Sequence, residues 1–170
     1  GLIYGMSPFG LTRSTDLTLA EAENFVKAYF ARFPGVKAYL DGTRRTATEQ
    51  GYVETLLGRR RYFPNLKSGT NYALRQREER EAINAPIQGT AADIIKLAML
   101  RLPDELEKAN LGAKLLLQVH DELILEVPKA ELTQTAALVK QVMENAYSMS
   151  VPITTDARSG ASWGELEPME

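Results

Sequence analysis

Apolar side chains recur at every third or fourth position in the first part of the chain, which is the spacing of a helix with one buried face. The pattern follows Thr18 and Glu21, which match a capping box. Pro34 ends this first helix, and a second should end near Gln50 with Gly51 as its left-handed cap. We expect the aromatic stripe of the first helix to lie in the core; its members are Ala22, Phe25, Val26, Tyr29, Phe30 and Phe33.

Helical spacing returns in the second half of the chain. A strongly charged helix is predicted over residues 72–84, and Pro86 should break it because proline lacks a backbone N–H and clashes with the preceding turn. A further helix restarts there; Pro103 predicts a kink or a break in it, and Gly112 a cap at its end. Another amphipathic helix follows Pro128. The buried stripe predicted after Pro86 consists of Ile94, Ile95, Ala98, Met99, Leu102 and Leu106.

Shorter apolar runs predict strands. Residues 52–56 and 59–63 flank Leu57 and Gly58 and are expected to form a hairpin. The run 151–157 is expected to form a last strand, at a sheet edge because it contains Pro152.

The most informative run is residues 115–127, where two apolar segments flank the polar triplet His120-Asp121-Glu122. We expect a hairpin of two largely buried strands, with the triplet at the rim of the sheet. Together the elements predict an α+β fold: a small antiparallel sheet packed on one side by helices, plus a helical N-terminal part.

Composition narrows the possible chemistry. The 170 residues are 44% hydrophobic and 25% charged, which is typical of one globular domain with a substantial core. No apolar run is long enough to span a bilayer, so no membrane partner is expected, and no secretory signal is recognisable. The absence of cysteine and the single histidine exclude thiolate and multi-histidine metal sites. A metal would need oxygen ligands, and Asp121 and Glu122 would suit Mg²⁺.

Charge is unevenly distributed behind a net value of −2. Between Arg44 and Arg77 there are eight basic residues and two acidic ones, a footprint suited to a polyanion such as nucleic acid. Arg77, Arg80 and Asn84 follow at spacings of three and four, so they share nearly one face of the predicted helix.

Four motifs, taken in order, resemble the C-terminal part of bacterial DNA polymerase I, a family A DNA polymerase. They are Gly-Leu-Ile-Tyr-Gly at residues 1–5, Gly-Tyr-Val-Glu-Thr-Leu-Leu-Gly-Arg-Arg-Arg-Tyr at 51–62, Asn-Ala-Pro-Ile-Gln-Gly-Thr-Ala-Ala-Asp at 84–93, and Leu-Leu-Gln-Val-His-Asp-Glu at 116–122. The resemblance implies that residues 1–70 comprise the end of the fingers helix, a helical fingers segment and a basic hairpin. Residues 71–170 would then be the C-terminal part of the palm, whose sheet carries the motif C hairpin.

The resemblance also implies roles for individual residues. Asp121 corresponds to a catalytic metal ligand, Glu122 to the acid that supports it, and His120 to a contact with the primer terminus. Tyr4 corresponds to the fingers tyrosine beside the templating base. The implied DNA contacts are Arg80, Asn84 and Gln88 along the template–primer, and Arg59, Arg60, Arg61 and Arg77 in the basic region.

The implied reaction is attack of a primer 3′ oxygen on the α-phosphate of a dNTP at a site with two Mg²⁺ ions. The second aspartate of that site belongs to motif A, which the resemblance places before Gly1 together with most of the fingers helix. The chain is therefore expected to be a piece of a longer protein and inactive alone. Its implied partners are primer–template duplex DNA, dNTP and the missing N-terminal part, in the bacterial cytoplasm at the nucleoid. The tail departs from the family, since the segment Ser-Gly-Ala-Ser-Trp at residues 159–163 lacks the acidic or amide residue often found before this tryptophan.

Three other functions remain open. A single-subunit RNA polymerase usually has serine after the motif C aspartate, so Glu122 argues against that class. A non-catalytic duplex-DNA-binding module would need the basic residues but not Asp121. A metal-dependent phosphohydrolase would need further acids near Asp121, and the nearest in sequence are Glu126 and Asp104.

Overall fold

A computed structural model describes residues 1–66 and 71–169. Lys67, one of the eight basic residues counted above, lies outside the described residues, as do positions 68–70, just before the predicted boundary at 70/71. The chain forms two compact units, Gly1–Thr90 and Ala91–Glu170. They are described separately below, and the division at 70/71 stays a prediction about polymerase subdomains.

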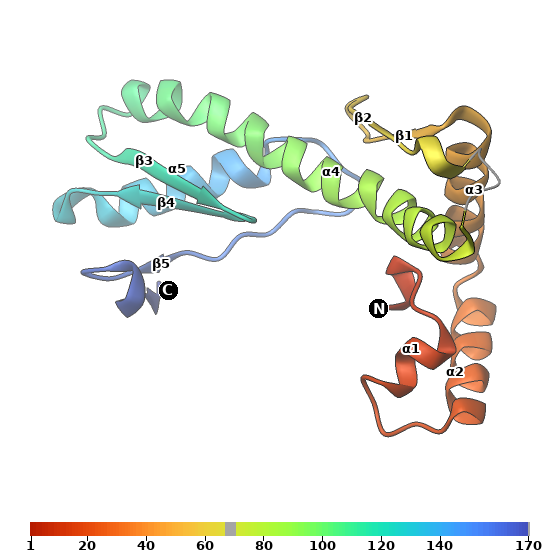
Figure 1. Ribbon diagram of the computed structural model, residues 1–170. Helices are drawn as coiled ribbons and strands as arrows, with labels where there is room; N and C mark the ends of the chain where they lie inside the picture. The colour runs from red at the N-terminus through yellow and green to blue at the C-terminus, as the bar shows by residue number, and fades with distance from the viewer. Residues whose placement is uncertain (67–70, 170) are drawn as a thin grey trace. The chain divides into compact units, whose positions relative to one another are not determined.

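The first unit is mainly helical, with one hairpin (Figure 1). Thr18 and Glu21 form the predicted capping box, in which the Thr18 N–H donates to Glu21 Oε2 at 2.8 Å. Gly51 takes the left-handed conformation with φ 81°, as its predicted cap position requires. The elements are η1 (Leu2–Tyr4), α1 (Pro8–Thr12), α2 (Leu19–Arg32), α3 (Pro34–Gln50), β1 (Tyr52–Glu54), β2 (Arg60–Tyr62), η2 (Pro64–Leu66) and the beginning of α4 (Tyr72–Lys108).

The core of this unit does not contain the aromatic stripe of α2, so that prediction was wrong. Only Ala22 of the stripe is buried, while Phe25 is 52% and Phe33 48% exposed. The main neighbours of α2 are the short α1 and α3, which leave much of its aromatic face uncovered. The buried residues that form the core are instead Ala47, Val53, Phe63, Leu66 and Ala82.

Helix α4 continues through Pro86, where a break was predicted, and it is also unbroken at Pro103. A proline in a helix interior costs about 3 kcal/mol, because one helical hydrogen bond is lost and the ring clashes with the preceding turn. Packing offsets this cost near Pro86, because Ile83 is fully buried before it and Thr90 Oγ1 accepts a hydrogen bond from the Leu56 N–H after it. Near Pro103, the side chain of Leu102 is fully buried in the core of the second unit.

The second unit contains the end of α4, a hairpin, α5 and a C-terminal segment. The hairpin lies beside α5 and the last turns of α4 (Figure 1), and the core joins all three elements. The predicted buried stripe of α4 contributes Ile95, Ala98, Leu102 and Leu106 to the buried residues. The elements after α4 are β3 (Lys114–Val119), β4 (Glu122–Glu126), η3 (Lys129–Glu131), α5 (Leu132–Glu144), β5 (Arg158–Ser159), η4 (Trp163–Glu165) and β6 (Glu167–Pro168).

The strands β3 and β4 are paired as predicted, but they are not largely buried. Helices cover one face, where Leu115, Leu123 and Leu125 pack against the core. Leu116 is 55% and Leu117 50% exposed, next to a register shift between Leu115 and Leu117. A bulge of this kind re-aims neighbouring side chains, which a simple alternation pattern cannot predict.

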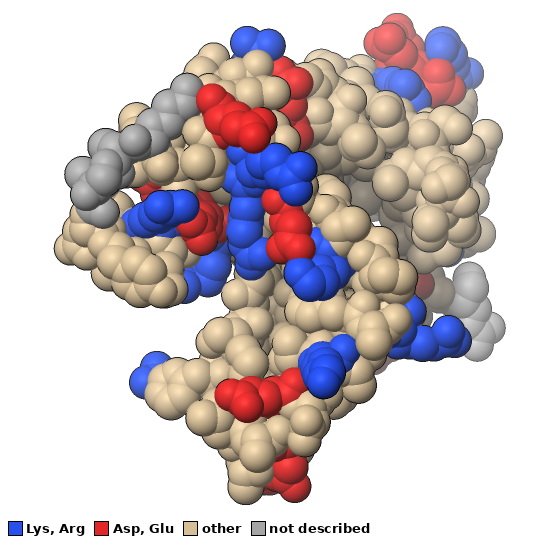
Figure 2. Space-filling view, turned by 90° about the vertical axis from the view of Figure 1, so that its right-hand side faces the viewer, with Lys and Arg blue, Asp and Glu red and all other residues tan. Residues whose placement is uncertain are grey.

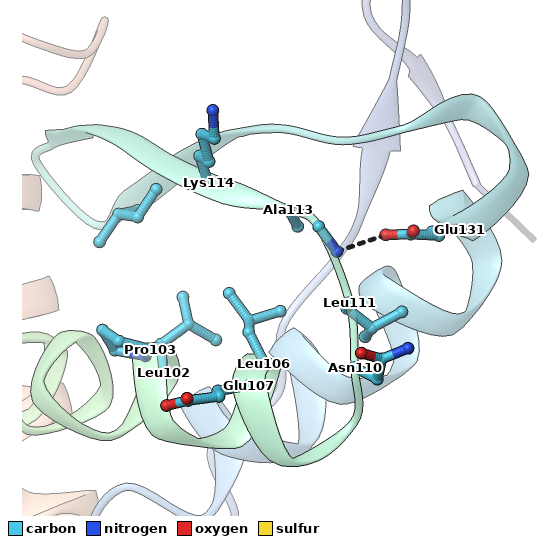
Figure 3. A pocket seen from close by; sticks show the side chains of 11 residues that line it. Leu102, Pro103, Leu106, Glu107, Asn110, Leu111, Ala113, Lys114 and Glu131 are labelled. Carbon is cyan, nitrogen blue, oxygen red and sulfur yellow. Dashed lines mark hydrogen bonds between the residues drawn. The ribbon is translucent and has the colours of Figure 1, made fainter.

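Two further predictions, on the cap of α4 and on the last strand, were wrong. Asn110, with φ 53°, takes the left-handed position after α4, whereas Gly112 donates its N–H to Glu131 Oε2 at 2.7 Å (Figure 3). That bond lies beside a pocket of about 720 Å³, lined mainly by apolar residues such as Leu102 and Leu106. The pocket borders Lys114, at the end of the hairpin away from the turn.

Residues 151–157 do not form the predicted strand. The Thr155 N–H donates instead to Glu144 Oε1 of α5 at 2.8 Å, and the short antiparallel pair β5–β6 follows. The fold class is nevertheless the predicted one, α+β with small antiparallel sheets and helices. Among the described helices, none combines the length and apolar character needed to cross a bilayer.

Candidate functional site

The turn between β3 and β4 presents the predicted polar triplet. Val119 pairs with Glu122, so His120 and Asp121 form a two-residue loop. His120 has φ 53°, a left-handed conformation that suits the first position of a tight hairpin turn. The Gln118 amide donates to the His120 carbonyl and fixes the loop further.

The two carboxylates of this turn are open to solvent. Asp121 and Glu122 are both exposed, and neither side chain forms a hydrogen bond or ion pair with another described residue. Free carboxylate oxygens suit a hard cation, and Mg²⁺ typically takes one or two protein carboxylates together with substrate phosphates and water. No group of three metal-binding side chains occurs within the described residues. The turn therefore fits part of a magnesium site.

A second set of candidates lies on α4, in the first unit. Arg80 and Gln88 are exposed, and their side chains have no hydrogen-bond or ion-pair partner in the described part of the chain. Asn84, one turn from each, is half-buried, and its Oδ1 atom is buried without a hydrogen bond among the described residues. Their spacing of four places all three along one face of the helix.

The basic hairpin β1–β2 brings other candidates beside this helix. A small pocket of about 150 Å³ is lined by Gln88 together with Arg59, Arg60 and Arg61. The approach is close at Gly89, where an added Cβ would lie 2.6 Å from Thr55 Cγ2. The structure therefore brings four of the predicted DNA-binding residues to one place.

Acidic side chains lie close to the basic ones in this region. Arg60 Nε contacts Glu54 Oε1 at 2.6 Å, and its guanidinium lies 4.6 Å from the centre of the Tyr52 ring. The hydrogen bond to Glu54 is the main reason why the pKa of Arg60 is raised. On the face drawn in Figure 2, basic side chains alternate with acidic ones rather than forming an unbroken basic patch.

One acid contacts two of the predicted DNA-binding arginines. Glu81 Oε2 accepts from Arg61 Nη2 at 2.7 Å, and its Oε1 accepts from Arg77 Nε at 2.8 Å. The hydrogen bond from Arg77 is the largest effect that lowers the pKa of the Glu81 carboxyl, and Arg61 adds to it. Glu81 is therefore ionised at neutral pH.

Tyr4 lies at the end of η1 and is 44% exposed. The next residue, Gly5, has φ 77° and approaches α4 closely, since an added Cβ would lie 3.6 Å from Arg80 Cγ. The segment that carries Tyr4 thus packs beside a predicted DNA contact. All of these candidates belong to the first unit, whereas His120, Asp121 and Glu122 belong to the second.

Three positions that matter for this geometry were missed from the sequence. Glu81 stands four residues after Arg77, a spacing that could have indicated the ion pair. Gly89 lies inside a helix, where glycine often signals close packing. Nothing in the sequence indicated that Thr90 would accept a hydrogen bond from Leu56.

Comparisons with known proteins agree on one family. The family model described as DNA polymerase family A matches residues 1–165. DNA polymerase I of Streptococcus pneumoniae is 49% identical over 98% of the chain, and that of Geobacillus stearothermophilus is 50% identical over 96%. The chain spans about a fifth of the length of these relatives, 19% and 18%.

A solved structure gives the same result. The POL domain of Pol1 from M. smegmatis, in complex with DNA primer-template and dNTP, is similar with a TM-score of 0.83 and 46% identity. The match covers 89% of this chain and 27% of the mycobacterial one. The chain belongs to DNA polymerase family A.

Proposed function

We propose that this chain forms part of a template-directed DNA polymerase, which transfers a nucleotide from dNTP to the 3′ hydroxyl of a primer. The observation that carries the proposal is the 49% identity with a DNA polymerase I over 98% of the chain. The exposed carboxylates of the β3–β4 turn are consistent with it. The similar mycobacterial domain was solved with primer-template and dNTP, which supports the same two partners here.

In this proposal, Asp121 is the catalytic metal ligand, and Glu122 supports the same site. Mg²⁺ ions held there would supply positive charge to the attacking and leaving oxygens of nucleotidyl transfer. Both side chains can serve because the tight turn exposes them without a competing protein cation among the described residues. His120, fixed in the same turn, is proposed to contact the primer terminus.

The residues of α4 and η1 are proposed to hold the template and primer. Arg80, Asn84 and Gln88 would contact minor-groove acceptors that A·T and G·C pairs share, so that any correct pair is accepted. Tyr4 would lie beside the templating base. The exposure of Arg80 and Gln88 supports this assignment, because both side chains are open to a ligand.

The basic hairpin and Arg77 are proposed to bind the DNA backbone. Contacts from arginine to phosphate add affinity without sequence preference, as a polymerase requires. The shared pocket of Arg59, Arg60, Arg61 and Gln88 supports a contact that joins backbone and groove.

A two-metal site requires a second carboxylate facing Asp121, and the described residues hold no group of three metal-binding side chains. We propose that another segment of the polymerase provides this aspartate, and that the chain alone extends no primer. The division into fingers residues 1–70 and palm residues 71–170 belongs to the same proposal. So does a location in the bacterial cytoplasm at the nucleoid, which the bacterial relatives support.

A chimaera tests this function directly. The chain would replace the matching segment of the Geobacillus stearothermophilus polymerase, with which it shares 50% identity over 163 residues. We expect the chimaera to add the dNTP that the template specifies, whereas the same polymerase without the segment, and the full chain alone, add none. A folded chimaera that binds duplex DNA but extends no primer would favour the non-catalytic DNA-binding module.

A further inference from the structure

Glu81 bridges two arginines that belong to different elements. It stands between Arg61 of β2 and Arg77 of α4, with one carboxylate oxygen on each guanidinium at 2.7 and 2.8 Å. These arginines come from different elements, 16 positions apart in the sequence but joined by this acid. The contact is therefore a tertiary link between the basic hairpin and the helix.

The two arginines remain accessible from solvent despite the link. The side chain of Arg61 is 54% exposed and that of Arg77 is 72% exposed, while Glu81 is 32% exposed. The guanidinium of Arg61 also lies 5.3 Å from the centre of the ring of Phe63, a core residue, so its position is well defined. An anion approaching from outside could reach both guanidinium groups.

A carboxylate bound by two arginines resembles a bound phosphate in charge and in hydrogen-bond acceptors. We propose that Glu81 is a built-in competitor for DNA phosphate, which occupies donors of Arg61 and Arg77 and so limits how tightly this surface holds the duplex backbone. The inference rests on the proposed function, because it concerns the DNA contact of that function.

Glu81 weakens phosphate binding through two physical effects. Glu81 occupies Nη2 of Arg61 and Nε of Arg77, which are then unavailable to a phosphate. Its negative charge also repels any phosphate that binds the remaining N–H groups. Without Glu81, both effects disappear, so backbone affinity and its dependence on salt should increase. A moderate affinity for the duplex backbone is useful, since a polymerase must move along its duplex after each nucleotide addition.

The test compares two glutamates on the same helix. Glu79 pairs with Arg75 at 2.9 Å, also at a spacing of four, and its side chain is 27% exposed. E81Q and E79Q therefore remove the same charge and a similar ion pair, but only Glu81 contacts predicted DNA-binding arginines. Duplex binding of the full chain is measured by fluorescence anisotropy over a series of salt concentrations, and thermal unfolding shows that each variant is folded.

We expect E81Q to bind duplex DNA roughly two- to five-fold more tightly than wild type. The slope of log affinity against log salt should steepen by about one unit, the value for one additional phosphate contact. E79Q should shift less in both measurements, and E81D, which keeps the charge, should stay close to wild type.

Other results overturn the inference in distinguishable ways. If E81Q equals E79Q, or binds more weakly than wild type, Glu81 is no competitor although the DNA contact stands. If the double variant R61Q/R77Q binds duplex DNA as tightly as wild type, the proposed backbone contact itself fails, and the role of Glu81 fails with it.

Discussion

The candidate DNA contacts are of two kinds, according to whether the side chain has an acidic partner. Arg60, Arg61 and Arg77 have acidic partners within the described structure, whereas Arg80 and Gln88 have none. An exposed side chain without a partner contributes little to the free energy of unfolding, so it is available to bind a ligand. The sequence predicted which residues carry the charge, but not their partners, because Glu81 meets Arg61 only after the chain has folded.

Arg80 and Gln88 give a prediction at this scale. In the chimaera, R80A or Q88A should slow primer extension by about ten-fold, since each lost groove contact is worth about 1–3 kcal/mol. The free energy of unfolding should change by less than about 0.5 kcal/mol, because both side chains are exposed. Rapid-quench extension and chemical unfolding measure the two quantities.

Gln76 supplies the control, as an exposed residue of the same helix that bonds only to Tyr72 among the described residues. Q76A should extend primers at the wild-type rate. A large loss of stability in R80A or Q88A would instead assign these residues to the fold.

At the level of elements, local signals predicted caps and turns better than helix continuation and burial. The capping box of α2, the cap at Gly51 and both hairpins are local features, and all four were correctly predicted. The continuation of α4 through Pro86 depends on contacts with β1–β2 that are distant in sequence, such as the Leu56–Thr90 hydrogen bond. The strand predicted at 151–157 failed because strand formation needs a neighbour, which a sequence pattern does not reveal.

The contact of the basic hairpin with α4 can be tested at Gly89. Alanine normally stabilises a helix interior relative to glycine by about 0.5–1 kcal/mol. At position 89 its Cβ would lie 2.6 Å from Thr55 Cγ2, and the stiff threonine side chain has little room to yield. We expect G89A to lower the free energy of unfolding by about 1–2 kcal/mol and to weaken duplex binding.

Two further variants isolate the cause. T55S removes the clashing methyl group. The free energy of unfolding that G89A costs should therefore be much smaller in the T55S background than in the wild type. G42A, in α3 with nothing within 4 Å of the added Cβ, should raise the free energy of unfolding by about 0.5–1 kcal/mol. Destabilisation of G42A and G89A to the same extent would argue against a specific contact.

On the scale of the whole molecule, each unit has its own core, and the candidate residues are divided between the two. The sequence predicted the α+β class and a turn at the triplet 120–122, because both follow from short-range patterns. The turn itself is shorter, since Glu122 begins β4. It overestimated burial of the β3–β4 hairpin and of α2, because exposure depends on which faces the rest of the chain covers. Family motifs supplied the residue roles, which neither periodicity nor composition contains.

The C-terminal segment offers a pH test of how it is held to α5. Hydrogen bonds from Thr155, first from its backbone N–H, lower the pKa of Glu144 below its ordinary value of 4.5. A lowered folded-state pKa means that the contact stabilises the fold above about pH 4.5 and is lost as pH falls through the lowered pKa.

Hydrogen exchange measures this effect at one amide. The Thr155 amide should be protected at neutral pH, lose protection on acidification, and be unprotected at all pH values in E144A, which has no side-chain acceptor. The Gly112 amide, which bonds to Glu131, serves as an internal control and should stay protected in E144A. Equal protection of Thr155 in both proteins at neutral pH would exclude the contact.

The most direct test of the central claim concerns Asp121 at the tip of the hairpin. Single-turnover primer extension would be measured in the chimaera with D121N, and with E126Q as a control that removes the same charge from an exposed position of β4. We predict a loss of at least about 10³-fold for D121N, equivalent to about 4 kcal/mol, with duplex binding retained and E126Q near wild type. Extension by D121N at the wild-type rate would contradict the assignment of this carboxylate as the catalytic metal ligand.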